Sequence, residues 1–166
     1  MTGFSSATVA RVLERDHGAC VRCGRSVDLS ARGIAWSVHH RRPRGMGGSR
    51  NPLVSAASNA LTLCGSGITG CHGTVESDRD SARQRGYLVP QWRDPADVPV
   101  LHRVHGWSWA GDTEWVPLVQ GELWMQAGEW LADEARLRGL DPSEDEFVSL
   151  SRAATDLYDL KAKEAA

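Results

Sequence analysis

The sequence predicts an α+β protein, and three observations lead to that class. Short β-type runs and helical runs follow one another along the 166 residues, without an internal repeat. Two pairs of cysteines bracket the central runs, as in a domain clamped by a metal ion. The chain from residue 119 onward has helical periodicity. The length suits one domain of ordinary size with an appended helical part.

The N-terminal part predicts a helix, then a strand, a loop and a second strand. Ser5 or Ser6 can cap the helix, and Gly18 can end it. Residues 34–40, IAWSVHH, and residues 60–64, ALTLC, have the composition of strands, and the stretch between them is rich in Gly, Pro, Ser and Arg. We expect the two strands to pair as a hairpin with a long loop.

A further helix and a further hairpin are predicted after the last cysteine. Residues 72–86 are polar, contain no proline and end in glycine, which favours a helix. Residues 106–118, GWSWAGDTEWVPL, alternate apolar residues around a Gly-Asp turn, which favours a hairpin. Its packing residues would be Trp107, Trp109 and Trp115.

Two amphipathic helices are predicted at the C-terminal end. The first covers roughly residues 119–138. The second begins at the sequence DPSE, in which Asp141 would be the N-cap, Pro142 the first helical residue and Glu144 the partner in a capping box. The expected buried residues of the two helices are Leu123, Ala127, Trp130, Leu131, Phe147, Leu150, Leu157 and Tyr158.

Charge is unevenly distributed, although the net charge is only −2. Residues 1–75 carry nine arginines against three acidic residues, residues 76–110 carry five of each, and residues 111–166 carry five basic against thirteen acidic residues. The N-terminal part therefore predicts an anionic partner, and the acidic part a different role. We divide the chain into a zinc-clamped domain at 1–95, a Trp-rich β extension at 96–118 and an acidic helical extension at 119–166.

The beginning of the sequence has neither the basic stretch nor the apolar segment of a secretory signal. No run is long and apolar enough to span a membrane. We therefore expect a cytoplasmic protein without a membrane partner.

The four cysteines predict a structural zinc ion. Cys20 and Cys23 have the two-residue spacing of a thiolate knuckle, and Cys64 and Cys71 enclose a wider loop that Gly65, Gly67 and Gly70 allow to curl. Two disulfides are the alternative, which a reducing compartment disfavours. A closed shell of four thiolates leaves no position for a substrate, so a catalytic metal would have to be a second ion.

Polar residues gather around the two predicted strands. His39 and His40 end the first strand, Asn59 precedes the second, and His72 follows the last cysteine. Because neighbours on a strand point to opposite faces, His39 and His40 are not expected to share one role.

This pattern resembles the HNH endonucleases, also called the His-Me finger or ββα-metal family, over about residues 8–95. The motifs that carry the resemblance are CVRC, VHHRRPRGMGGSRNP, SNALTLC and CHGTVES. The histidine and arginine segment is most similar to HNH endonucleases of bacteriophages of actinobacteria. The resemblance implies a ββα-metal core, with His39 and His72 as ligands of a divalent ion, His40 as the general base and Asn59 as an orienting residue.

The chemistry of phosphodiester hydrolysis agrees with these roles. A neutral imidazole such as that of His40 can accept a proton from water near neutral pH. Two histidine ligands leave positions open on a divalent ion, which can neutralise charge on the phosphate. Imidazole is compatible with Mn²⁺, Ni²⁺ or Zn²⁺, while Mg²⁺ prefers oxygen ligands, so we expect Mn²⁺ or Ni²⁺ to support cleavage at least as well as Mg²⁺. Asn59 could hold the loop after the first strand or offer its carbonyl oxygen to the ion.

The glycine-rich loop predicts the contact with DNA. Arg41, Arg42, Arg44 and Arg50 flank the expected base and can bind phosphates. No helix shows a pattern for reading bases, so we expect double-stranded DNA to be bound through its backbone, with weak sequence preference. RNA stays open as a substrate.

Two other classes of function compete with the nuclease. A zinc-ribbon module could bind DNA without cutting it, in which case the three histidines would be incidental. Alternatively, the acidic C-terminal helices could bind a partner protein, such as a phage packaging protein, to which the nuclease activity is subordinate.

Overall fold

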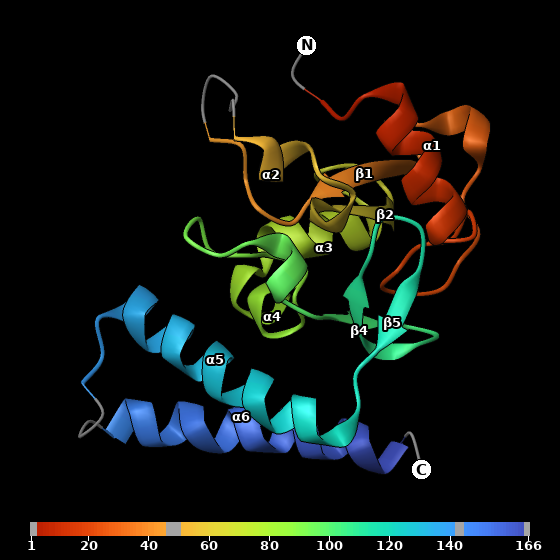
Figure 1. The fold of residues 1–166 in the computed structure, drawn as a ribbon. Coiled ribbons are helices and arrows are strands. Elements are labelled where there is room, and N and C mark those ends of the chain that lie inside the picture. The colour runs from red at the N-terminus through yellow and green to blue at the C-terminus, as the bar shows by residue number, and fades with distance from the viewer. Residues whose placement is uncertain (1–2, 46–50, 142–144, 165–166) are drawn as a thin grey trace. The chain divides into compact units, whose positions relative to one another are not determined.

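The computed structural model describes residues 3–45, 51–141 and 145–164, and it is an α+β structure with small sheets (Figure 1). Its two compact units are Met1–Pro117 and Leu118–Ala166. In the described part of the chain, no helix has the length and apolar character needed to cross a membrane. The predicted class is confirmed.

Within the described residues, the first unit contains the strands and the short helices. In chain order its elements are α1 (Ser6–Arg15), η1 (Leu29–Ala31), β1 (Trp36–His40), α2 (Pro52–Ser55), η2 (Ala57–Asn59), β2 (Ala60–Cys64), α3 (Gly70–Ser77), α4 (Arg79–Gln84), η3 (Pro95–Asp97), β3 (Val100–His102), β4 (Gly106–Ala110) and β5 (Trp115–Pro117). Two sheets form, one from β1 and β2 and one in the order β3-β4-β5.

The first helix begins and ends where its local sequence predicts. The Ser5 side chain caps α1 by accepting a hydrogen bond from the Thr8 amide. After the helix, His17 and Gly18 both have positive φ, and the Gly18 amide donates back to the Leu13 carbonyl. This turn leads the chain directly into the first cysteine pair.

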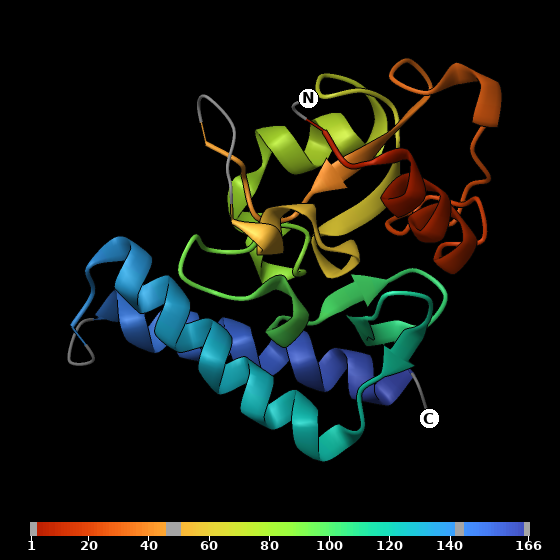
Figure 2. The ribbon, with the colours of Figure 1, turned by 45° about the horizontal axis from the view of Figure 1, so that its top comes forward.

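The predicted hairpin is confirmed: β1 and β2 pair antiparallel, with Trp36 opposite Cys64 and His40 opposite Ala60. One end of the hairpin therefore carries a cysteine and the other a histidine. The first strand begins at residue 36 rather than 34, and part of the expected loop forms α2 and η2. Helix α3 packs on both strands (Figure 2).

The prediction of a single helix over residues 72–86 is wrong, because the structure has two helices, α3 and α4, with a break at Asp78. Asp78 adopts a non-helical conformation and its side chain accepts a hydrogen bond from the Ser81 amide, which makes it the N-cap of α4. Helix α3 begins at Gly70, so Cys71 and His72 lie in its first turn.

The Trp-rich hairpin is also confirmed, and β3 adds a third strand beyond the two that the sequence predicts here. Trp107 and Trp115 are buried, while Trp109 is half-buried. Trp115 and Val100 share a core cluster with Cys20 and Leu61. Residues 96–117 thus belong to the same compact unit as the residues that precede them.

The second unit is a pair of packed helices, α5 (Gln120–Arg138) and α6 (Asp145–Glu164). Gly139, with φ of 67°, ends α5 in the left-handed conformation. Pro142 and Glu144, which were expected to start the second helix, lie outside the described residues, as does the side chain of Tyr158. Leu123, Ala127 and Leu150 are buried as predicted. The other predicted residues that the structure describes are only half-buried: Trp130, Leu131, Phe147 and Leu157.

Candidate metal centres

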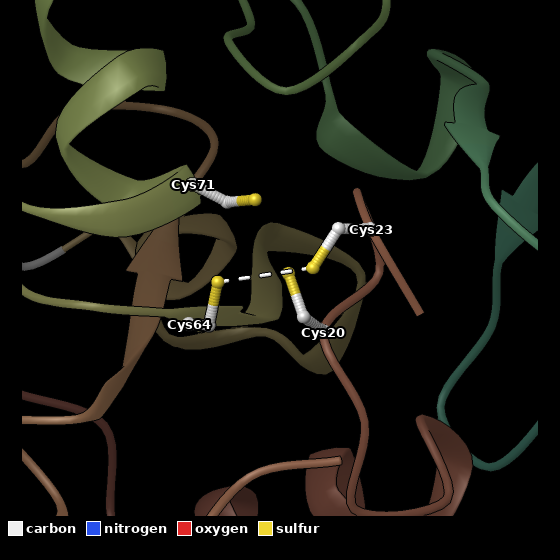
Figure 3. Close-up of side chains that lie close together, drawn as sticks. All are labelled: Cys20, Cys23, Cys64 and Cys71. Carbon is white, nitrogen blue, oxygen red and sulfur yellow. Dashed lines mark hydrogen bonds between the residues drawn. The ribbon is translucent and has the colours of Figure 1, made fainter. Parts of the chain in front are cut away.

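Four cysteine sulfurs meet at one end of the first hairpin. Cys20 and Cys23 come from the turn after α1, Cys64 ends β2, and Cys71 lies in the first turn of α3; Figure 3 shows their side chains pointing toward one another. Their Sγ atoms all lie within 4.8 Å of one another, and those of Cys23 and Cys64 are 3.8 Å apart. A tetrahedral zinc site with bonds of about 2.3 Å has sulfur–sulfur distances of about 3.8 Å. All four cysteines are free, so the cluster could hold a zinc ion.

Glycine is required at two positions of the wider cysteine loop. Gly65 and Gly70 both have positive φ, and a Cβ on Gly65 would lie 2.1 Å from the Thr69 carbonyl oxygen. A Cβ on Gly70 would lie 2.7 Å from the Cys64 carbonyl oxygen. A Cβ on Gly67 would meet nothing within 4 Å. The loop therefore needs two of the three glycines that the sequence interpretation emphasised.

The protonation of the cysteine cluster depends on burial and on a neighbouring arginine. Burial raises the pKa of the Cys20 and Cys71 thiols. Arg22 lies beside the cluster, and its Nη1 donates to Cys71 Sγ at 3.6 Å. A divalent ion would favour the thiolate forms and release their protons, because only the thiolate is a strong ligand.

A second cluster lies at the other end of the hairpin and joins β1 to α3. His39 is the last residue but one of β1, while His72 and Glu76 are one turn apart on α3. The Glu76 Oε1 atom is 3.5 Å from His39 Nδ1 and 3.6 Å from His72 Nε2. One ligand atom from each residue lies within 4.8 Å of the others. Two imidazoles and a carboxylate form a donor set that suits a divalent transition-metal ion.

The His39 ring is oriented by a main-chain group. His39 is buried, and its Nε2 is 2.9 Å from the Tyr87 carbonyl oxygen. Because a carbonyl only accepts, Nε2 carries the proton and donates, which leaves the Nδ1 lone pair on the side of His72 and Glu76. Such a hydrogen bond is the usual support of a metal-binding histidine.

Glu76 was missed by the sequence interpretation. Hydrogen bonding to the His39 ring in its protonated form, followed by the charges of His39, His72 and Arg79, holds the pKa of the Glu76 carboxyl group below its usual value. It is therefore anionic at neutral pH. Its four-residue spacing from His72 on one helix was the available signal, since residues i and i+4 share a face.

His40 is separate from this metal cluster among the described residues. Its ring stacks on that of Phe4, with 3.9 Å between centroids and 15° between planes. Burial, together with the charges of Arg44, His39 and His72, lowers the pKa of His40 to about 4. The imidazole is thus neutral at pH 7.

Asn59 uses its whole side-chain amide to hold the chain just after β1. It is fully buried, and its Oδ1 accepts from the Arg42 amide at 2.5 Å. Its Nδ2 donates to the carbonyls of Arg42 and Val54 at 3.3 and 3.0 Å. Of its two expected roles, the geometry favours holding the loop over binding a metal.

The prediction that Arg41 contacts phosphate is wrong, because its guanidinium group is fully buried. It donates to the main-chain carbonyls of Ser58, Gly86, Pro95, Val98 and Pro99. Arg42 and Arg44 are partly exposed, and Arg42 also donates to the Arg93 carbonyl. Arg50 lies outside the described residues.

The same strand–strand–helix unit thus carries two groups of side chains that could hold a metal ion, one of four cysteines and one of two histidines and a glutamate. No family model matches the chain, and no curated protein or solved structure matches it either.

Proposed function

We propose that this protein is a metal-dependent HNH-type endonuclease that hydrolyses DNA phosphodiester bonds. The observation that carries the proposal is the convergence of His39, His72 and Glu76, with His40 next to His39 in the chain. The order of strand, loop, strand and helix supports a ββα-metal core. In this proposal the cysteine cluster is a structural zinc site that ties the first turn to β2 and α3.

His39, His72 and Glu76 would hold the divalent ion. When bound, such an ion neutralises charge on the scissile phosphate and on the departing oxygen. In this proposal His40 accepts the proton of the attacking water, a role for which an imidazole is chemically suited. Asn59 keeps the chain after His40 in place through the Arg42 main chain.

DNA is bound through its phosphates. Arg44 is partly exposed and follows His40 by four residues, so in this proposal it binds a phosphate beside the base. Arg42 extends the same surface. Binding through phosphates predicts strong salt dependence and weak sequence preference.

Nicking of supercoiled plasmid tests the proposal. Zinc-loaded wild type should nick DNA with Mn²⁺ or Ni²⁺ at least as well as with Mg²⁺, and chelation should stop the reaction. His40→Ala and His72→Ala should both abolish cleavage, while Thr74→Ala, an exposed position on the same helix, should not. Intact plasmid under every divalent ion would refute the proposal, and DNA binding without cleavage would identify a zinc-ribbon binding module instead.

A further inference from the structure

The aromatic ring of Phe4 covers one face of the His40 imidazole. The ring centroids are 3.9 Å apart and the planes differ by only 15°, so the two rings are stacked. Phe4 is 8% exposed, although it lies at the beginning of the described chain. A residue far away in sequence thus forms one wall of the site around the expected base.

Local sequence holds Phe4 in this position. Phe4 directly precedes Ser5, the N-cap of α1, and Val9 lies at the fourth helical position. An apolar pair at these two positions forms a hydrophobic staple, which sets the angle at which the chain enters the helix. Phe4 and Val9 belong to one buried cluster, together with Val12 and Trp36. The side chain of Phe4 is therefore anchored independently of His40.

The main chain and the ring of His40 are held by different contacts. The main chain is fixed by pairing with Ala60, and the next residue donates its amide to the Asn59 carbonyl at 2.9 Å. Strand pairing does not fix the ring, because the second side-chain torsion of histidine is broad. The stack with Phe4 restricts the ring plane and leaves the ring edge, with its nitrogens, to meet a water molecule.

We propose that Phe4 is a positioning residue that sets the orientation of the His40 imidazole for proton transfer. This inference rests on the proposed nuclease function. A general base must lie within hydrogen-bond distance of the proton that it removes, and a displacement of about 1 Å can cost about 100-fold in rate. Ordering of the N-terminal segment is thereby coupled to catalysis.

Steady-state cleavage by matched variants tests the inference. Phe4→Leu keeps an apolar side chain without a ring and should lower kcat by about 10- to 100-fold with KM unchanged. Phe4→Tyr keeps the ring and should restore most of kcat. Val12→Ala is the control, because it loosens the same buried cluster without a ring contact to His40, and it should keep the wild-type kcat.

The NMR resonances of the His40 ring protons report on the contact with Phe4 and not on overall stability. These resonances should lose the shift caused by the aromatic ring in Phe4→Leu and keep it in Phe4→Tyr and Val12→Ala. Wild type that cleaves DNA alongside a fully active Phe4→Leu, or unshifted His40 resonances in the wild type, would overturn the positioning role alone. Wild type that cleaves nothing would overturn the proposed function itself.

Discussion

Asn59 and Arg42 are joined by two hydrogen bonds, in which the side-chain amide of Asn59 pairs with both main-chain groups of Arg42. These hydrogen bonds hold the chain that follows the two histidines against Asn59, the residue that precedes β2. A third bond, to the Val54 carbonyl, extends the same support to α2. The expected orienting residue therefore acts on the main chain.

Replacing Asn59 with Asp should destabilise the fold and slow cleavage. The carboxylate would face the carbonyls of Arg42 and Val54 without a donor, and unsatisfied buried groups cost about 1–3 kcal/mol. Urea unfolding measures the loss. Gln91→Ala, which removes one exposed bond to the Pro43 carbonyl, is the control and should cost clearly less. Equal losses in the two variants would contradict the role of Asn59.

Substitutions of Arg41 and Arg44 should affect different properties, although both residues belong to the same arginine-rich segment. The first should lower stability and the second should weaken DNA binding. Arg41→Met leaves five carbonyls without their donor and should lower the free energy of unfolding by about 3 kcal/mol or more. Arg44→Ala should change stability by less than about 0.5 kcal/mol. It should instead weaken DNA binding and reduce the salt dependence by about one phosphate contact. Salt-dependent DNA binding and urea unfolding of both variants distinguish the two roles.

Gly65 and Gly67 form a matched pair for the cysteine site. Gly65→Ala would place a Cβ 2.1 Å from a carbonyl oxygen and force the loop between Cys64 and Cys71 to move, so zinc content should fall. Gly67→Ala meets open space and should keep one zinc ion per chain. Elemental analysis of the purified proteins measures both. Full zinc content in Gly65→Ala would show that the loop adapts.

Glu76→Gln should weaken the second metal site and leave the first intact. Loss of the carboxylate should reduce Mn²⁺ affinity by about tenfold or more, since even outer-shell changes have effects of this size. Calorimetric titration of zinc-loaded protein measures the affinity. Ser77→Ala, the exposed neighbour, is the control. Unchanged Mn²⁺ affinity in Glu76→Gln would exclude this carboxylate as a ligand.

Acid should destabilise the first unit through His102. Its Nδ1 accepts from the amides of Val104 and His105, and burial, followed by the charge of His105, lowers its pKa from 6.5 to about 4. Between these two pH values the unfolded chain binds a proton that the folded protein does not. The contribution of His102 to stability is therefore complete above pH 6.5 and decreases as the pH falls toward 4. The loss attributable to this group should be about 3 kcal/mol at pH 4.

The variant His102→Asn isolates the contribution of His102, because other groups also titrate between pH 4 and pH 6.5. The Asn carbonyl can still accept a hydrogen bond but does not titrate. Urea unfolding at several pH values should show a shallower loss in this variant than in the wild type between pH 6.5 and pH 4. Parallel curves for the two proteins would assign the acid sensitivity elsewhere.

Local patterns in the sequence were sufficient for most of the secondary structure. The N-cap at Ser5, the strand at residues 60–64 and the two-residue spacing of Cys20 and Cys23 all depend on neighbours in the chain. The break at Asp78 was missed, although it is local, because an aspartate within a polar run can either continue a helix or cap a new one.

The sequence by itself determined the cysteine cluster, the hairpin and the positions of the histidines, because turn chemistry and periodicity act over a few residues. Only the tertiary structure decided that Arg41 is buried, that Tyr87 orients His39 and that Phe4 stacks on His40. The partners in these contacts lie between 36 and 58 positions apart in the chain. The pairs are Phe4 with His40, His39 with Tyr87, and Arg41 with Pro99. Burial of a charge depends on which distant carbonyls surround it, and no local pattern carries that information.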